Sequence, residues 1–146
     1  MMLCLPCPPY CVVLADDHAH VRANLKRVIS QLPDLKIVGE AADGLELLDL
    51  LEGLETAPNL LLLDISMPRL SGLAVAPRVK EAYPGVKILI LTVHNDEEYL
   101  HQALRIGVQG YMLKEDAGSE LSPAIRAIQN GQVYISPSMS SKSPPA

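Results

Sequence analysis

One segment of the sequence is the clearest indication of the fold: Asn59-Leu-Leu-Leu-Leu-Asp64-Ile-Ser-Met-Pro68-Arg-Leu-Ser-Gly72. Its four consecutive leucines are too short a run for a typical helix and are typical of a strand buried on both faces of a parallel sheet. Pro68 and Gly72 interrupt the chain before a new helical pattern begins. Asp64 ends the strand, where open α/β sheets bind their ligands. It can equally serve as a helix cap or turn residue, because aspartate is a favoured cap.

Length and composition predict one globular domain that is large enough to have a proper hydrophobic core. The chain has 146 residues, of which 49% are hydrophobic. Its net charge is −5, which offers no basic face for nucleic acid, and no apolar run is long enough to span a membrane. We therefore expect this domain itself to bind neither nucleic acid nor a membrane.

The three cysteines, Cys4, Cys7 and Cys11, all lie near the amino end. Their odd number and the lack of later partners argue against a disulfide framework and favour a reducing cytoplasm. Their spacing also allows part of a metal site, but a closed zinc site needs four ligands and no fourth is nearby.

The rest of the chain alternates short apolar runs with helical patterns. Strands are predicted over residues 11–15, 35–42, 60–63, 86–91 and 110–113, and helices over 21–32, 45–54, 73–83, 96–106 and 119–129. Pro77 should kink the third helix or delay its start, whereas Pro123 lies near the first turn of the last helix, where a missing N–H costs little. Five βα units joined by right-handed crossovers make an α/β, doubly wound parallel sheet with helices on both faces.

Two tails flank the predicted domain, which covers residues 10–136. Residues 1–9 form an amino-terminal tail with no positive n-region, and its prolines make it a poor signal peptide. Residues 137–146, Pro-Ser-Met-Ser-Ser-Lys-Ser-Pro-Pro-Ala, have the composition of a linker.

Polar side chains follow four of the predicted strands. They are the acid pair Asp16 and Asp17, then Asp64, Thr92 and Lys114. Because parallel strands end at one edge of a sheet, these side chains should meet there. Three carboxylates in one place repel one another and need a cation or a shifted pKa, and hard oxygen ligands suit Mg²⁺. A lysine and a hydroxyl facing the same point suit a tetrahedral anion such as a phosphoryl group.

These residues, in this order, resemble the response-regulator receiver domain of bacterial two-component signalling. The resemblance covers about residues 11–136 and also rests on Tyr111, on the Asp64-Ile-Ser-Met-Pro68 segment and on Gly72. It implies a flavodoxin-like (βα)5 fold with strand order 2-1-3-4-5, whose switch point lies beside Asp17 and Asp64.

The resemblance implies that Asp64 accepts a phosphoryl group from a sensor histidine kinase. Asp17, Asp64 and the backbone carbonyl of Ser66 would bind Mg²⁺ directly, and Asp16 would bind it through water. The chemistry agrees, because phosphoryl transfer needs an in-line nucleophile, charge neutralisation and positioning more than acid–base groups. The protein would be a signalling switch rather than an enzyme, catalysing only its own phosphorylation and dephosphorylation.

The remaining implied roles concern the switch. Thr92 and Lys114 would bind the phosphoryl group, and Thr92 and Tyr111 would move when it arrives. Ser66 and His94 lie where the family tunes the rate of dephosphorylation. Phosphorylation would then bias a surface that has two states. Tyr111 can also be a strand-end aromatic residue that only packs on the last helix.

Two segments narrow the resemblance to the NarL/FixJ-like subfamily, whose receivers precede a helix-turn-helix output domain. They are residues 107–114 and 124–137. The subfamily implies transcription regulation through a DNA-binding output domain that these 146 residues do not contain. We therefore expect a truncated chain rather than a stand-alone receiver, and a homodimer on activation.

Three other functional hypotheses account for fewer of the polar residues at the strand ends. A phosphohydrolase with an aspartyl nucleophile needs a second aspartate two residues later, where this chain has Ser66. A pseudo-receiver would not need the full set of acids, Thr92 and Lys114. A nucleotide- or flavin-binding protein would need a glycine-rich loop after the first strand. The four histidines are scattered, which favours surface positions over a metal site.

Overall fold

The computed structural model describes residues 9–137, so Cys4, Cys7 and most of both predicted tails lie outside the described residues. The strands are β1 (Tyr10–Ala15), β2 (Leu35–Ala41), β3 (Leu60–Asp64), β4 (Lys87–Thr92), β5 (Gly110–Leu113) and β6 (Tyr134–Ile135). The helices are α1 (Ala19–Ser30), α2 (Gly44–Gly53), α3 (Gly72–Ala82), α4 (Glu97–Ile106) and α5 (Ala117–Gln129), with a 3₁₀ turn, η1 (Lys114–Asp116), before α5. Within residues 9–137, each helix is too short or too polar to traverse a lipid bilayer.

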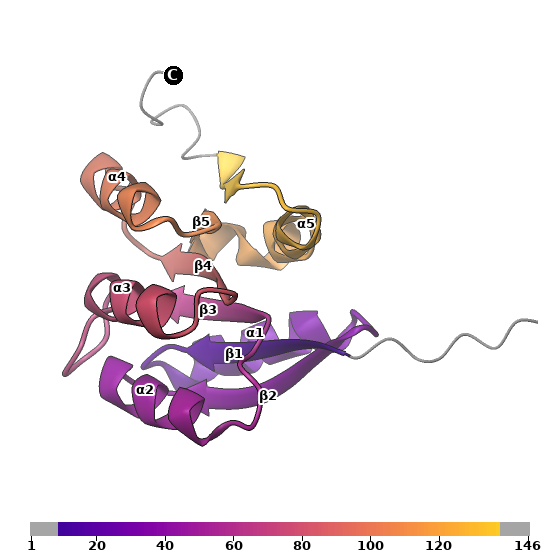
Figure 1. Ribbon diagram of the computed structural model, residues 1–146. Helices are drawn as coiled ribbons and strands as arrows, with labels where there is room; N and C mark the ends of the chain where they lie inside the picture. Colours follow the sequence, from indigo (N-terminus) through magenta and orange to yellow (C-terminus); the bar gives the residue numbers. More distant parts are fainter. Residues whose placement is uncertain (1–8, 138–146) are drawn as a thin grey trace, which may run out of the picture.

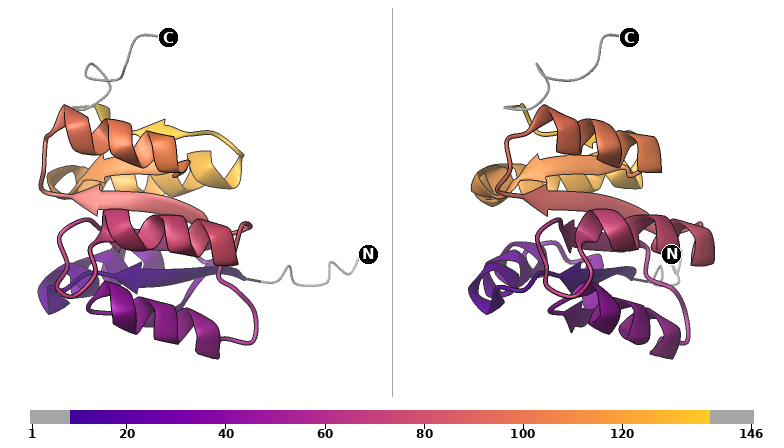
Figure 2. Two further views of the ribbon diagram at one scale, coloured as in Figure 1. Left: turned by 60° about the vertical axis from the view of Figure 1, so that its left-hand side comes forward. Right: turned by 90° about the vertical axis from the view of Figure 1, so that its left-hand side faces the viewer.

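All the strands are parallel and form one sheet in the order β2-β1-β3-β4-β5-β6 (Figure 1). Helices α2, α3 and α4 cover one face of the sheet, and α1 and α5 cover the other (Figure 2). The doubly wound α/β fold and the order 2-1-3-4-5 are therefore confirmed.

One strand was not predicted. Beyond α5, Gly131 turns the chain at φ +80° and β6 pairs with β5, extending the sheet. Ser136 is buried, and its N–H donates to the Tyr111 carbonyl over 2.9 Å. Two residues are too few to show a strand period, which explains why the sequence pattern did not identify β6.

Burial on both faces explains the leucine run of β3. Leu61 and Leu63 belong to the core beneath α2, α3 and α4, whereas Leu60 and Leu62 belong to the core beneath α1 and α5. Successive side chains of a strand point to opposite faces, so a strand between two helical layers needs apolar residues at every position.

Pro77 does not delay the start of its helix, and Pro123 lies deeper in its helix than predicted. The start of α3 is not delayed: it begins at Gly72, with the Ser71 hydroxyl accepting from the Ala74 N–H over 3.2 Å, and it continues past Pro77 to Ala82. Pro123 is inside α5 rather than in its first turn, because α5 begins at Ala117 as a continuation of η1. Each helix packs a fully buried face on the sheet, which offsets the hydrogen bond that its proline cannot make.

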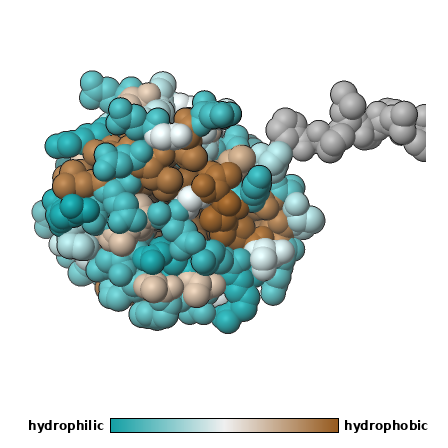
Figure 3. Space-filling model, turned by 90° about the horizontal axis from the view of Figure 1, so that it is seen from below, coloured by the Kyte–Doolittle hydropathy of each residue, from teal (hydrophilic) through white to brown (hydrophobic). Residues whose placement is uncertain are grey.

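The β2 edge of the sheet is partly covered. Figure 3 views the molecule from this side and shows brown apolar surface interspersed with teal hydrophilic side chains. Arg22 and Lys26 reach from α1 to Glu40 on β2, over 3.0 and 2.8 Å. Lys36 is exposed on the same strand. Charges on an edge strand discourage pairing with another chain.

Candidate functional site

The carboxyl ends of β1, β3 and β5 bring three predicted site residues together. Lys114 Nζ lies 2.7 Å from Asp16 Oδ2 and 3.3 Å from Asp64 Oδ2. The carboxylate side chains are only 3% exposed and that of Lys114 is 14% exposed. One ammonium group thus lies between two buried carboxylates, which leaves the cluster with an excess of negative charge.

Asp64 is held in an environment that disfavours its charged form. Burial, followed by the neighbouring Asp16 carboxylate, raises the pKa of Asp64 to about 6, against the opposing effect of Lys114. Its Oδ1 accepts the Ser66 N–H over 3.3 Å, whereas Oδ2 makes no hydrogen bond and has only the ion-pair contact with Lys114 Nζ at 3.3 Å. A buried anionic oxygen without a hydrogen bond is suited to a cation or to a reacting electrophile.

Asp64→Asn is expected to stabilise the metal-free protein at neutral pH. Because the folded-state pKa of Asp64 is raised, the wild type loses stability as the pH rises from about 4 to about 6. The full difference corresponds to about 3 kcal/mol, and solvent at the mouth of the site should reduce the gain to about 1–2 kcal/mol. Urea unfolding in EDTA at pH 7.5 and pH 4 measures it. The gain should vanish at pH 4, and an equal gain at both pH values would contradict this electrostatic origin.

A histidine joins the acidic cluster. Ligand atoms of Asp16, Asp17, His18 and Asp64 all lie within 4.8 Å of one another. His18 Nδ1 is 3.0 Å from Asp17 Oδ1 and 3.3 Å from Asp16 Oδ1. The sequence pattern favoured a surface position for His18, and the residue is indeed exposed, but it also contacts both acids. One feature of the sequence could have predicted this contact: His18 directly follows the acid pair, and in the structure it is the N-cap residue of α1.

The loop between β3 and α3 folds back tightly on Asp64. The Gly72 N–H donates to the Ile65 carbonyl over 2.9 Å. A Cβ atom at Gly72 would lie 2.1 Å from the Asp64 carbonyl oxygen, so no larger residue fits there without moving the loop. Ser66 lies within this loop, exposed, two residues after Asp64.

His94 connects the predicted switch and rate-tuning residues. Its backbone N–H donates to Thr92 Oγ1 over 3.0 Å, and its carbonyl lies 3.5 Å from the Tyr111 hydroxyl, which donates to it. Its Nε2 is 2.8 Å from Ser66 Oγ, and its ring is 5.1 Å from the ring of Tyr99 on α4. Thr92 and Tyr111 are fully buried, and burial raises the pKa of Tyr111. Tyr111 therefore packs inward and contacts the loop after β4 at the same time.

Comparison with known proteins decides which family this arrangement belongs to. The family model of the response regulator receiver domain matches residues 12–126. The chain belongs to this family. The receiver domain is 40% identical over 129 residues to the oxygen regulatory protein NreC of Staphylococcus carnosus, and 41% identical over 125 residues to NreC of Staphylococcus aureus. These alignments cover 88% and 85% of the chain but 58% and 57% of the relatives, so the chain spans little more than half their length.

Solved structures agree with this assignment. The isolated receiver domain of RcsB from Salmonella enterica serovar Typhimurium, with the phosphomimetic BeF3⁻, superposes with a TM-score of 0.86 at 28% identity, covering 93% of this chain and 99% of that one. A LuxR-family response regulator from Aurantimonas gives 0.85 at 30% identity, covering 92% and 94%. These relatives support assigning the chain to the NarL/FixJ-like subfamily. The chain is the receiver domain of a two-component response regulator.

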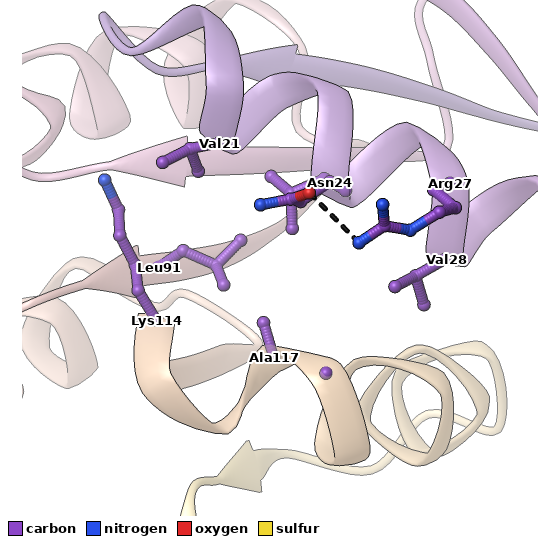
Figure 4. A pocket seen from close by; sticks show the side chains of 9 residues that line it. Val21, Asn24, Arg27, Val28, Leu91, Lys114 and Ala117 are labelled. Carbon is purple, nitrogen blue, oxygen red and sulfur yellow. Dashed lines mark hydrogen bonds between the residues drawn. The ribbon is translucent and has the colours of Figure 1, made fainter.

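A groove opens beside the cluster of this receiver domain. It lies between α1 and α5, encloses about 210 Å³ and is bordered by Lys114 (Figure 4). Apolar side chains make up most of its lining, with polar groups beside them: Val21, Asn24, Leu25, Arg27, Val28, Leu91, Lys114 and Ala117. Arg27 donates to Asn24 Oδ1 over 3.0 Å at its edge.

Proposed function

We propose that Asp64 accepts a phosphoryl group from a sensor histidine kinase in a Mg²⁺-dependent reaction, and that the aspartyl phosphate switches a transcriptional output. The observation that carries the proposal is the buried cluster in which Lys114 lies against Asp64 and Asp16. It combines a nucleophilic carboxylate, one oxygen of which makes no hydrogen bond, with an adjacent cation that can pair with phosphoryl oxygens. We propose no substrate other than the domain itself, which promotes its own phosphorylation and dephosphorylation.

The transfer forms one bond and breaks one. A carboxylate oxygen of Asp64 attacks the phosphorus of a phosphohistidine, and the P–N bond breaks with its electron pair going to the imidazole of the kinase. Lys114 pairs with the phosphoryl oxygens as the Asp64 carboxylate becomes an acyl phosphate, a mixed anhydride. In the resting state Asp16 holds Lys114 at 2.7 Å, close to its place of action.

The donor set fits Mg²⁺. Asp17, Asp64 and the backbone carbonyl of Ser66 would hold the ion, with Asp16 acting through water, because hard oxygen ligands suit this cation. When bound, the ion would neutralise charge on the phosphoryl oxygens. His18 Nδ1, 3.0 Å from Asp17 Oδ1, would help to orient this carboxylate.

Thr92 and Tyr111 would carry the switch. Thr92 Oγ1 accepts the His94 N–H in the present arrangement, which leaves the hydroxyl proton to donate to a phosphoryl group. Tyr111 is held through the His94 carbonyl, and a shift of the loop after β4 therefore changes its contact as well. Phosphorylation then biases two arrangements of this loop and α4.

The Ser66–His94 hydrogen bond should protect the aspartyl phosphate from water. Its partners come from the loops after β3 and β4 and meet across the mouth of the site at 2.8 Å. A hydrogen bond of this kind contributes about 1 kcal/mol, equivalent to about fivefold in a rate. His94→Ala and Ser66→Ala are each expected to shorten the phosphoprotein lifetime about that much, measured by loss of phosphoryl mass over time. The double variant should show no further loss, and additive or opposite effects would refute shielding by this bond.

The groove between α1 and α5 lies beside the site, and we propose that a helix of the kinase packs in it. A kinase helix packed there would place a phosphohistidine near Lys114.

The solved RcsB assemblies include two dimers bound to two parallel DNAs. By analogy, we propose a homodimer on activation that binds DNA through an output domain rather than through this domain, and a cytoplasmic location beside the kinase.

Intact-protein mass tests the proposal. Wild type and Asp64→Ala are incubated with Mg²⁺ and a small phosphodonor, with and without EDTA. One phosphoryl group should appear on the wild type with Mg²⁺ and on neither the variant nor the chelated sample. A wild type that neither gains this mass nor binds beryllofluoride would be a pseudo-receiver.

A further inference from the structure

A salt bridge joins the β3–α3 loop to the start of α2, away from the reacting groups. Arg69 Nε and Nη2 both donate to Asp43 Oδ2, over 2.9 and 2.7 Å. Asp43 Oδ1 accepts the Glu46 N–H over 2.8 Å, which caps α2. The Asp43 side chain is only 9% exposed, and these partners hold its pKa below the usual range. A buried carboxylate at a helix N-terminus thus anchors the arginine of a loop.

The backbone of the loop is strained at the same residue. Arg69 has φ +67° and is the one non-glycine residue with positive φ between residues 9 and 137. Strain of this kind persists only where the surroundings fix the backbone. They do so here: a Cβ atom at Gly44 would lie 2.4 Å from the Leu70 carbonyl oxygen, so the start of α2 touches the loop backbone directly.

We infer that Arg69 is a positioning residue for the metal site, acting through Asp43. The inference rests on the proposed function and extends it to residues outside the cluster. Arg69 is three residues from Ser66, whose carbonyl would bind Mg²⁺. One side of the loop is fixed by the Ser66 N–H on Asp64 Oδ1 and by the Gly72 N–H on the Ile65 carbonyl. The Arg69–Asp43 contact fixes the outer part of the loop. Together these contacts hold the Ser66 carbonyl in one position.

Arg69→Gly separates positioning from stability. Glycine adopts positive φ without strain, so the variant loses the salt bridge but also relieves the backbone, and urea unfolding should change little. Loss of groups that hydrogen-bond metal ligands directly typically weakens metal binding by one to two orders of magnitude, and for this exposed arginine, which acts through the loop, we expect the lower end of about tenfold. Calorimetric titration with MgCl2 alone measures the dissociation constant. Arg69→Lys keeps the positive charge but loses the two-nitrogen contact, so its dissociation constant should lie between those of wild type and Arg69→Gly.

Arg126→Ala is the matched control. Arg126 also donates twice to one aspartate, Asp34, over 2.8 and 2.9 Å, but joins α5 to the chain before β2. It should leave Mg²⁺ affinity unchanged. Affinity of Arg69→Gly within twofold of wild type would overturn the positioning role while leaving the proposed function intact. A wild type that does not bind Mg²⁺ would overturn both.

Discussion

Lys114→Met is expected to lower the free energy of unfolding by about 3 kcal/mol at pH 7.5 in EDTA. The substitution keeps most of the apolar stem but removes the ammonium group between Asp16 and Asp64. Breaking a buried ion pair costs about 3–5 kcal/mol because a charge is left uncompensated, and uptake of a proton by the carboxylates should place this case at the lower end. Urea unfolding of wild type and variant in the same buffer measures the loss.

The origin of this loss can be identified with two further samples. Mg²⁺ should restore part of the lost stability, since it supplies positive charge to the same carboxylates. Adding Asp64→Asn to Lys114→Met should also recover stability, because one of the two repelling charges is removed. Lys26→Met is the matched control: Lys26 lies 2.8 Å from Glu40 on the surface, where such pairs contribute less than about 1 kcal/mol. Equal losses from both lysines would contradict the cluster as the cause.

Gly72→Ala should have a comparable effect for a steric reason. The added methyl group would lie 2.1 Å from the Asp64 carbonyl oxygen, a backbone atom that can move only with β3. Forcing extra atoms into a packed region typically costs about 1–3 kcal/mol, and contact with backbone rather than with a flexible side chain predicts the upper end. The displaced carbonyl belongs to Asp64, the proposed phosphoacceptor, so phosphorylation by a small donor should slow as well. Urea unfolding and intact mass measure the two effects.

Gly53→Ala provides the opposite outcome from the same exchange. Gly53 lies in the last turn of α2, and a Cβ atom there would meet nothing within 4 Å. Alanine in a helix is favoured over glycine by about 0.5–1 kcal/mol, so this variant should be slightly more stable than wild type. If both alanines destabilised alike, the close approach at Gly72 would not be the reason for its effect.

The sequence identified the parts of the site that lie at strand ends. Asp16, Asp64 and Lys114 each follow an apolar run directly, and parallel strands must end at one edge, so their convergence follows from pattern alone. Neighbours that depend on loop conformation were not identifiable in this way. His18 joins the acids through the turn before α1, and Arg69 meets Asp43 across 26 residues of chain. Neither contact has a period or a motif that marks it.

The α/β sheet, its five βα units and the edge where the polar residues gather could be predicted from the sequence alone. Apolar periodicity encodes these features, because burial on one or both faces requires a particular spacing. Four features could not be predicted in this way: β6, the course of α3 and α5 through their prolines, the central place of His94 and the Arg69–Asp43 contact. These depend on packing and hydrogen bonds between segments far apart in the chain, where tertiary contacts outweigh local preference.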